Sequence, residues 1–187
     1  MTRIVAGAAG GRRLAVPPRG TRPTADRVRE ALFSALEATL DLDGARVLDL
    51  YAGSGALGLE ALSRGAALAT LVESDRTAVK ILRENATSVG LPGADVRMGR
   101  VATVLAETPS APYDLVLADP PYALGEDDLA AVLTALVDNG WTSEGTVIVV
   151  ERDRRSGPPR WPTTLTPDRS RRYGETELHW ATRQGDR

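Results

Sequence analysis

The chain has 187 residues, which is long enough for one domain with a substantial apolar core. It contains no cysteine and a single histidine, so disulfides, thiolate metal sites and multi-histidine metal sites are excluded, and we expect no bound metal. No stretch reaches the roughly 18 apolar residues of a membrane span and the first residues form no apolar signal segment, so we expect a soluble, cytoplasmic protein without a membrane partner.

The net charge of −2 conceals two basic segments. Residues 1–30 contain seven arginines against Asp26 and Glu30, and residues 152–172 contain seven arginines against two aspartates. Clustered arginine is the usual partner of phosphate, so the two segments suggest a nucleic-acid partner. Two solvated charged segments would give the same pattern, and the composition leaves both interpretations open.

The first 40 residues predict a β-hairpin followed by a helix. Residues 3–6 and 12–16 are short apolar-leaning segments around a Gly-Gly pair, which is typical of a small hairpin. Two prolines end it, and a basic loop follows. Apolar residues then recur every four positions from Val28 to Leu40, which predicts an amphipathic helix with Thr24 at its N-cap.

From residue 46 onward, apolar strands alternate with helices. Strands that are apolar throughout indicate a parallel sheet covered on both faces, so we predict an α/β fold with a doubly wound, Rossmann-like sheet. Residues 169–182 predict an antiparallel pair of strands around Gly174 at the sheet edge. We divide the chain into a hairpin extension with a basic loop at 1–23 and a main domain at 24–187. The predicted strands are 46–51, 68–73, 95–98, 113–119 and 145–151, and the predicted helices are 55–65, 75–90, 101–107 and 125–140.

The stretch GSGALG at 53–58 has the spacing of a cofactor-binding turn between a strand and a helix. Glu73 stands 20 residues after Gly53, at the end of the next strand, where an acid suits the ribose of a dinucleotide or of S-adenosylmethionine. Asp49 favours S-adenosylmethionine, because a carboxylate there repels pyrophosphate and attracts an amino group and a sulfonium. A P-loop fits less well, since no Gly-Lys-Ser/Thr follows. A glycine turn that is needed only for packing and binds no cofactor is an alternative interpretation.

The segment Asp119-Pro120-Pro121-Tyr122 follows the strand predicted at 113–119. Two prolines fix φ twice and remove two N–H donors, so we expect a stiff backbone whose carbonyls stay unpaired. With the Asp119 carboxylate and the Tyr122 ring, such a site can accept both hydrogens of a planar amine while stacking its ring. The lone pair of such an amine is delocalised into its ring, which makes the nitrogen a poor nucleophile. Acceptors for its hydrogens favour the transition state in which the nitrogen attacks. A rigid loop that only closes the strand is the alternative.

The run VLDLYAGSGALGLEAL, followed by LVESD and LADPPY, resembles the class I S-adenosylmethionine-dependent methyltransferases that modify exocyclic amino groups. That class acts on adenine, cytosine, guanine or the glutamine amide. The stretch GTRPTADRVREALF narrows the choice, because it resembles the RsmD family of small-subunit rRNA guanine-N2 methyltransferases. The resemblance covers residues 3–151 with the motifs in order, and the rest of the chain matches loosely.

The resemblance implies methyl transfer from S-adenosylmethionine to the N2 of one guanine in 16S rRNA, in the 30S subunit or an assembly intermediate, and we expect a monomer. The main domain is then a class I methyltransferase domain. The implied catalytic residues hold the amine and stack on the base, and they are Asp119, Pro120, Pro121 and Tyr122. The implied cofactor residues are Asp49, Tyr51, Ala52, Gly53, Ser54, Gly55, Glu73, Ser74, Arg100 and Val101. The arginines expected to contact RNA are Arg12, Arg13, Arg22, Arg27 and Arg29.

Two other functions remain open at this point. The same catalytic loop would serve an amino methyltransferase that acts on DNA or on a protein glutamine. A non-catalytic RNA-binding assembly factor would keep the basic segments around a vestigial cofactor site. The intact Asp49, glycine turn, Glu73 and D-P-P-Y segment argue against that last function.

Overall fold

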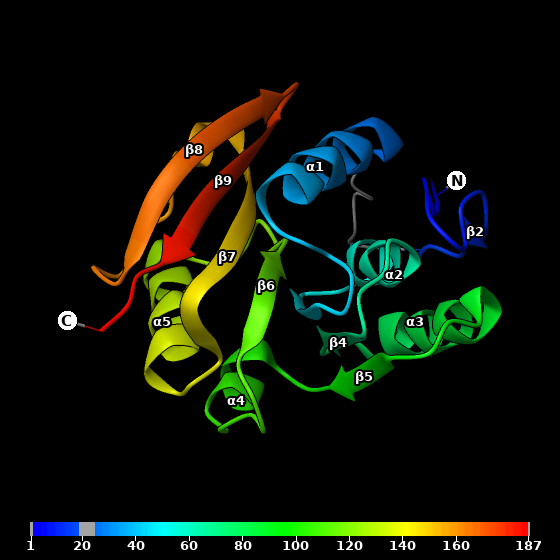
Figure 1. Cartoon of the computed structure of the whole chain (residues 1–187), viewed down its shortest axis with the longest axis horizontal. Coiled ribbons are helices and arrows are strands. Elements are labelled where there is room, and N and C mark those ends of the chain that lie inside the picture. The colour runs from blue at the N-terminus through cyan, green and yellow to red at the C-terminus, as the bar shows by residue number, and fades with distance from the viewer. Residues whose placement is uncertain (1, 19–24, 187) are drawn as a thin grey trace.

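A seven-stranded sheet forms the centre of the computed structural model, which describes residues 2–18 and 25–186 (Figure 1). Its strands are β3 (Arg46–Leu50), β4 (Leu68–Glu73), β5 (Ala94–Met98), β6 (Tyr113–Ala118), β7 (Thr142–Asp153), β8 (Leu165–Tyr173) and β9 (Thr176–Arg183). They lie side by side in the order β5-β4-β3-β6-β7-β9-β8. The parallel strands run outward from β3 in both directions, which confirms the predicted doubly wound sheet.

The predicted antiparallel pair at the sheet edge is also confirmed. β9 runs antiparallel to β7 on one side and to β8 on the other. β7 is longer than the sequence predicted because its last residues continue to pair with β9, as far as Asp153 opposite Thr176. β8 likewise begins before the predicted strand, at Leu165 opposite Arg183. Pairing with a neighbour, rather than local propensity, therefore sets these two boundaries.

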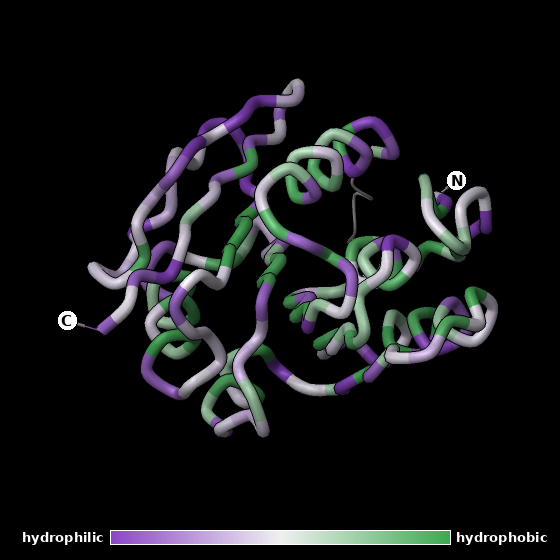
Figure 2. Tube along the Cα trace, in the orientation of Figure 1, coloured by the Kyte–Doolittle hydropathy of each residue, from purple (hydrophilic) through white to green (hydrophobic). Residues whose placement is uncertain are grey.

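Helices cover both faces of the sheet, as the apolar strands predicted. The α-helices are α1 (Asp26–Thr39), α2 (Ala56–Ser63), α3 (Arg76–Val89), α4 (Val101–Leu105) and α5 (Glu126–Asp138), and a short 3₁₀ helix, η1 (Arg154–Ser156), follows β7. Apolar residues of α1, α2 and α3 join one buried cluster, and those of α4 and α5 join another. Figure 2 shows the hydrophobic strands at the centre of the molecule. Within the described ranges, no helix has the length and apolar character needed to cross a bilayer.

Helix α1 buries the apolar face that its four-residue spacing predicted. Val28, Leu32 and Leu36 are buried, and the helix ends at Thr39. Its N-cap position is Ala25, whose side chain forms no capping hydrogen bond. Thr24, the residue expected at the N-cap, lies outside the described residues.

The predicted N-terminal hairpin is present as β1 (Thr2–Arg3) paired antiparallel with β2 (Arg13–Leu14). Its turn lies against the end of α2, where the Ser63 carbonyl accepts the Ala8 amide at 2.7 Å. Gly7 has φ +84°, and a Cβ there would stand 1.9 Å from the Ser63 carbonyl oxygen, so only glycine fits. The boundary at residue 23 between an extension and a main domain stays a prediction.

A buried ionic cluster joins the hairpin and α1 to α2. The fully buried Glu60 carboxylate lies 3.6 Å from Arg29 Nε and 3.6 Å from Arg64 Nε. It also accepts the backbone amides of Val5 at 2.8 Å and Ala6 at 3.3 Å. Arg29 is fully buried and donates to the Arg3 carbonyl, so the expectation that Arg29 contacts RNA is wrong. Arg29 lies on the inner side of α1, where its Nη2 donates to Asp26 Oδ1 at 2.8 Å and its Nε faces Glu60.

Glu60→Gln is expected to lower the free energy of unfolding by about 3–5 kcal/mol, because it removes the negative charge that two buried guanidinium groups share. Urea unfolding measures this loss. Glu37→Gln is the matched control, since Glu37 is 47% exposed and pairs with the same Arg64. That change should cost less than about 1 kcal/mol. Equal losses in the two variants would contradict the role assigned to Glu60.

Candidate active site

Four acidic side chains meet at the carboxyl edge of the parallel strands. In the register of the sheet, Leu50 of β3 pairs with Val72 of β4 and with Ala118 of β6. Glu73 and Asp119 follow those partners directly, and Asp49 immediately precedes Leu50. Ala118 pairs in turn with Val150 of β7, which brings Glu151 to the same edge. Ligands of doubly wound sheets bind at this edge, so the geometry brings the predicted cofactor and catalytic motifs together.

The GSGALG turn joins β3 to α2 through residues with positive φ. Gly53 has φ +56°, and Gly55, the N-cap of α2, has φ +85°. A Cβ on Gly55 would lie 2.3 Å from the Leu82 side chain, so packing as well as conformation requires glycine there. Tyr51 has φ +60° and is the one non-glycine residue with positive φ in the described part of the chain. Such strain is typical of functional turns.

Asp49 is buried beneath this turn. Its Oδ2 accepts the Gly58 backbone amide of α2 at 2.9 Å. Burial raises the pKa of Asp49 to about 7, the Gly58 hydrogen bond opposes that rise, and the negative charge of Glu73 adds to it. The carboxylate is therefore ready to ionise fully when a positive group binds next to it.

Glu73 ties the end of β4 to the glycine turn. Its Oε2 accepts the Gly53 amide at 2.8 Å, and its Oε1 accepts the Ser74 and Asp75 amides at 3.0 Å each. Asp75 in turn caps α3 by accepting the Ala78 amide at 2.8 Å. The spacing of 20 residues between Gly53 and Glu73 thus corresponds to a direct hydrogen bond.

Asp119 opens the D-P-P-Y segment at the end of β6. Burial, followed by the charges of Glu151 and Asp49, raises the pKa of Asp119 well above its usual range. Among the described residues no group donates to the Pro120 carbonyl, but the Pro121 carbonyl accepts the Leu124 amide at 3.0 Å. The expectation that both proline carbonyls stay unpaired is therefore wrong for Pro121, because the chain turns back there. The Tyr122 side chain is 74% exposed and free to stack on a ligand.

The end of β5 supplies the third part of the predicted cofactor site. Arg100 is the exposed N-cap residue of α4, and Val101 is buried in the first turn of that helix. The Gly99 amide donates to the Glu73 carbonyl at 2.9 Å, which holds this segment beside β4. Contact of Arg100 and Val101 with an adenine stays a prediction.

Comparison with known proteins identifies the family. The family model described as conserved hypothetical protein 95 matches residues 2–182. The chain belongs to this family. It is 40% identical to ribosomal RNA small subunit methyltransferase D of Escherichia coli K12, over 98% of this chain and 92% of the relative. The protein of the same name from Haemophilus influenzae is 34% identical, over 81% of this chain and 79% of the relative.

Solved structures of the same fold include a hypothetical protein of Thermus thermophilus. It superposes with a TM-score of 0.81 at 35% identity, and the match covers 97% of this chain and 99% of that one. The family assignment agrees with the resemblance that the GTRPTADRVREALF stretch and the LADPPY motif indicated.

The structure sorts the arginines that were expected to contact RNA. Arg12, Arg13 and Arg27 are exposed, and Arg12 Nη1 donates to the Ser88 carbonyl at the end of α3 at 2.9 Å. Arg22 lies outside the described residues. Arg29 is the buried residue of the ionic cluster.

Sequence reasoning missed two residues of the site. Glu151 ends the apolar run GTVIVVE as Glu73 ends LATLVE, so the rule that ligands bind at strand ends could have found it. Asn85 gave no comparable signal. Its Nδ2 donates to the Ser54 carbonyl at 2.8 Å and to the Ala15 carbonyl at 2.9 Å, and its Oδ1 accepts the Ala15 amide at 2.9 Å. Asn85 therefore connects the N-terminal extension directly to the glycine turn.

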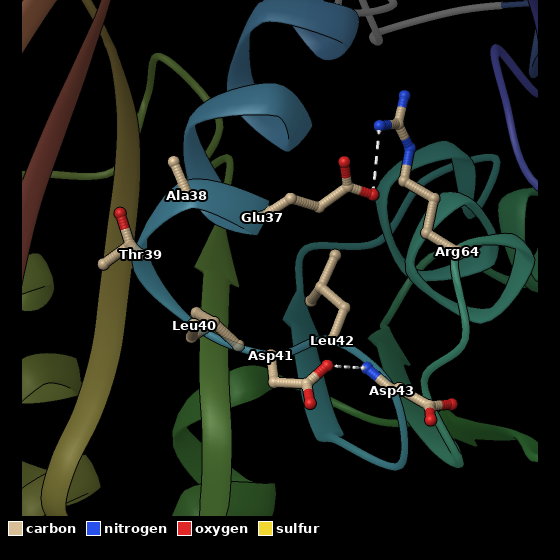
Figure 3. A pocket seen from close by; sticks show the side chains of 8 residues that line it. All are labelled: Glu37, Ala38, Thr39, Leu40, Asp41, Leu42, Asp43 and Arg64. Carbon is tan, nitrogen blue, oxygen red and sulfur yellow. Dashed lines mark hydrogen bonds and ion pairs between the residues drawn. The ribbon is translucent and has the colours of Figure 1, made fainter.

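The described residues contain no group of side chains arranged to hold a metal ion. A cavity of about 470 Å³ lies elsewhere, where α1 ends beside Arg64 (Figure 3). Asp41 and Asp43 of its lining precede β3, so it opens at the amino edge of the sheet. The length of β3, about 3.3 Å per residue, separates this cavity from the glycine turn.

Asn85→Ala is expected to lower the free energy of unfolding by about 3 kcal/mol, because it leaves the buried Ser54 carbonyl and the two part-buried backbone groups of Ala15 without their partner. Urea unfolding gives the value. Asn139→Ala serves as control, since its Nδ2 donates only to the Leu105 carbonyl, which Trp141 also reaches. We expect a loss of about 1 kcal/mol there. An Asn85 variant as stable as the control would refute the connecting role.

Asp49 predicts a pH dependence of stability. The unfolded chain begins to release the Asp49 proton near pH 3.8, whereas the folded protein keeps it up to about pH 7. The contribution of Asp49 to stability is therefore full below the lower value, falls between the two and levels off above about pH 7, and Asp119, whose pKa is also raised, adds a fall of the same sign. Asp49→Asn, which can still accept the Gly58 amide, should flatten this fall, as melting temperatures across the range will measure. The exposed Asp43→Asn control should retain it, and an unchanged profile for Asp49→Asn would contradict the assignment.

Proposed function

We propose that this protein transfers a methyl group from S-adenosylmethionine to the exocyclic N2 of a guanine in 16S rRNA. The observation that carries the proposal is the position of the GSGALG turn and the D-P-P-Y segment at the ends of paired strands β3 and β6. The 40% identity to an Escherichia coli small-subunit rRNA methyltransferase supports it. The rRNA is presented by the 30S subunit or an assembly intermediate, and the protein acts there as a monomer in the cytoplasm.

The residues at the strand ends fit S-adenosylmethionine, which supplies an electrophilic methyl group on a positively charged sulfur. Asp49 offers a carboxylate to the amino and sulfonium charges. Glu73 Oε2 accepts one amide and keeps an acceptor site for a ribose hydroxyl. The turn at 53–55 lets the backbone approach the cofactor, because two of its three residues are glycine.

Asp119 and the Pro120 carbonyl suit the acceptor amine. The guanine amino group is a poor nucleophile because its lone pair is delocalised into the ring. Accepting both of its hydrogens favours the pyramidal transition state, and the exposed Tyr122 ring stacks on the base. As the bond from the amine nitrogen to the methyl carbon forms, the bond from that carbon to sulfur breaks and S-adenosylhomocysteine is the leaving group. The methylated nitrogen would then carry an extra proton, which the Asp119 carboxylate would accept. Burial and then the charges of Glu151 and Asp49 raise the pKa of Asp119, and a cation bound near Asp49 offsets the part due to charge.

Asp119→Ala should lower kcat for methyl transfer by about 100–1000-fold, the range seen when one group that stabilises a transition state is removed. Tritiated methyl transfer from S-adenosylmethionine to 30S subunits that lack the modification measures it, with nuclease digestion to identify the labelled nucleoside. Asp95→Ala, which removes an exposed carboxylate near the start of β5, away from its carboxyl end, should retain full activity.

The identity of the labelled product decides between the functions. N2-methylguanosine from the wild type and none from Asp119→Ala would support the proposal. Label on adenine, DNA or a protein glutamine would assign another acceptor to the same site. Absence of S-adenosylmethionine binding in calorimetry, with and without RNA, would leave a non-catalytic RNA-binding protein.

A further inference from the structure

The second basic segment of the sequence lies at the sheet edge, close to the candidate active site. Glu151 of β7 pairs with Leu178 of β9, which pairs with Arg171 of β8. Asp119 stands one position beyond the pair formed by Ala118 and Val150, so it shares this cross-strand row. Three strand spacings of about 4.8 Å separate Asp119 from Arg171 across the sheet, or about 14 Å.

Six arginines gather on what we call the β8 edge, defined as residues 154–161 and 165–173. They are Arg154, Arg155, Arg160, Arg169, Arg171 and Arg172. Figure 2 shows the hydrophilic character of β8 toward its end. The exposed side chains of Arg155 and Arg171 form no hydrogen bond or ion pair with any residue that the structure describes.

The other four arginines have partners within the protein: Arg160 pairs with the exposed Asp127, and Arg169 donates to Thr39. Arg172 is 68% exposed and lies 3.6 Å from Glu177, and Arg154 lies 4.0 Å from Glu175. Exposed ion pairs such as that of Arg154 contribute at most about 1 kcal/mol, whereas the pair of Arg172 has one buried partner, Glu177. A phosphate group, which forms stronger charge-assisted hydrogen bonds with arginine, can displace them.

A cleft of about 360 Å³ opens on the β8 edge with Arg169 in its lining, which is mostly aromatic and proline side chains. It has the size of a small-ligand pocket, and Trp161 is half-buried in its wall. Arg169 lies over the Trp180 ring, with the guanidinium carbon 4.2 Å from the ring centroid. The lining is Pro158, Pro159, Trp161, Pro167, Asp168, Arg169, Ser170, His179 and Trp180.

Cationic side chains beside an aromatic cleft are the arrangement by which proteins bind single-stranded nucleic acid, with phosphates on the arginines and bases on the rings. Charges on an edge strand also prevent pairing between sheets, and Arg171 and Arg172 serve that purpose. Preventing such pairing does not account for the arginines of residues 154–160, which precede the edge strand, or for the cleft.

We propose that the β8 edge binds a single-stranded segment of the substrate RNA, with phosphates on Arg155, Arg171 and Arg172 and one base in the cleft against Trp161. This proposal rests on the proposed function. The RNA then lies across the carboxyl edge of the sheet, between this surface and the hairpin that carries Arg12 and Arg13. Figure 1 shows the β8 edge and the hairpin on opposite sides of the end of β6.

The test compares Arg155→Ala/Arg171→Ala/Arg172→Ala with Lys80→Ala/Arg83→Ala, whose exposed cations lie on α3 near the opposite edge of the sheet. Binding to a single-stranded RNA oligonucleotide is measured as a function of salt concentration. Because each phosphate contact on a single strand contributes about 0.7 to the salt slope, the triple variant should lower the slope by about 2. The control should leave it unchanged, and equal slopes in both variants would overturn the proposal.

Activity on 30S subunits gives the second readout. The triple variant should raise the KM for subunits at least about tenfold and leave kcat at saturation intact, because it removes binding alone. Loss of subunit binding without loss of RNA binding would overturn the proposal. The β8 edge would then bind a ribosomal protein. If the wild type makes no N2-methylguanosine, the proposed function fails. The salt dependence of binding to RNA alone still tests the β8 edge in that case, because it does not require methyl transfer.

Trp161 is tested by two substitutions, because the residue also packs against the buried cluster beneath α4 and α5. Trp161→Ala should weaken binding of the oligonucleotide by about 5–150-fold, the range for loss of one stacked base, and Trp161→Phe should restore most of it. Equal binding by wild type and Trp161→Ala, with both proteins shown to be folded by a thermal melt, would refute the proposal that a base binds in the cleft.

Discussion

The parallel pairing of β3 with β4 on one side and with β6 on the other is the constraint on which the site depends. Parallel strands end at one edge, so side chains that are 70 residues apart in the chain become neighbours there. The result is a concentration of carboxylates in a buried place. Burial raises the pKa of Asp49 and of Asp119, and the neighbouring carboxylates raise both further. Such a site favours ligands that bring positive charge or hydrogen-bond donors, as a sulfonium and an amine do.

Buried polar groups hold the N-terminal segment onto this frame. Glu60 accepts two amides of the hairpin and faces two arginines, while Asn85 links Ala15 to the glycine turn. Removing any partner leaves an unsatisfied group in the interior, so the position of the segment is tightly specified. The proposed RNA contacts Arg12 and Arg13 therefore stand on an element fixed relative to the cofactor turn. Under the proposed function, this arrangement aligns the substrate with the methyl donor.

Local patterns predicted most of the fold. The run LATLVE matches β4 residue for residue, and the helix pattern from Val28 matches the buried face of α1. The predictions were wrong where a contact with a residue distant in sequence sets the end of a strand or the direction of a side chain. β7 extends to Asp153 because β9 is beside it, and Arg29 turns inward because a buried glutamate is there to receive it. In the candidate site, Glu73 followed from spacing, but Asn85 did not, because backbone carbonyls distant in sequence leave no pattern.

By itself the sequence determined the sheet class, the glycine turn, Asp49, Glu73 and Asp119, because each depends on periodicity or on spacing within a short stretch, and its motifs resembled the family to which the chain belongs. Only the tertiary structure decided which arginines are free to meet phosphate and which neutralise a buried acid. A charged side chain looks the same in sequence whether it faces water or a carboxylate. The cost of desolvation, which the packing of α1 against α2 sets, separates Arg29 from Arg27.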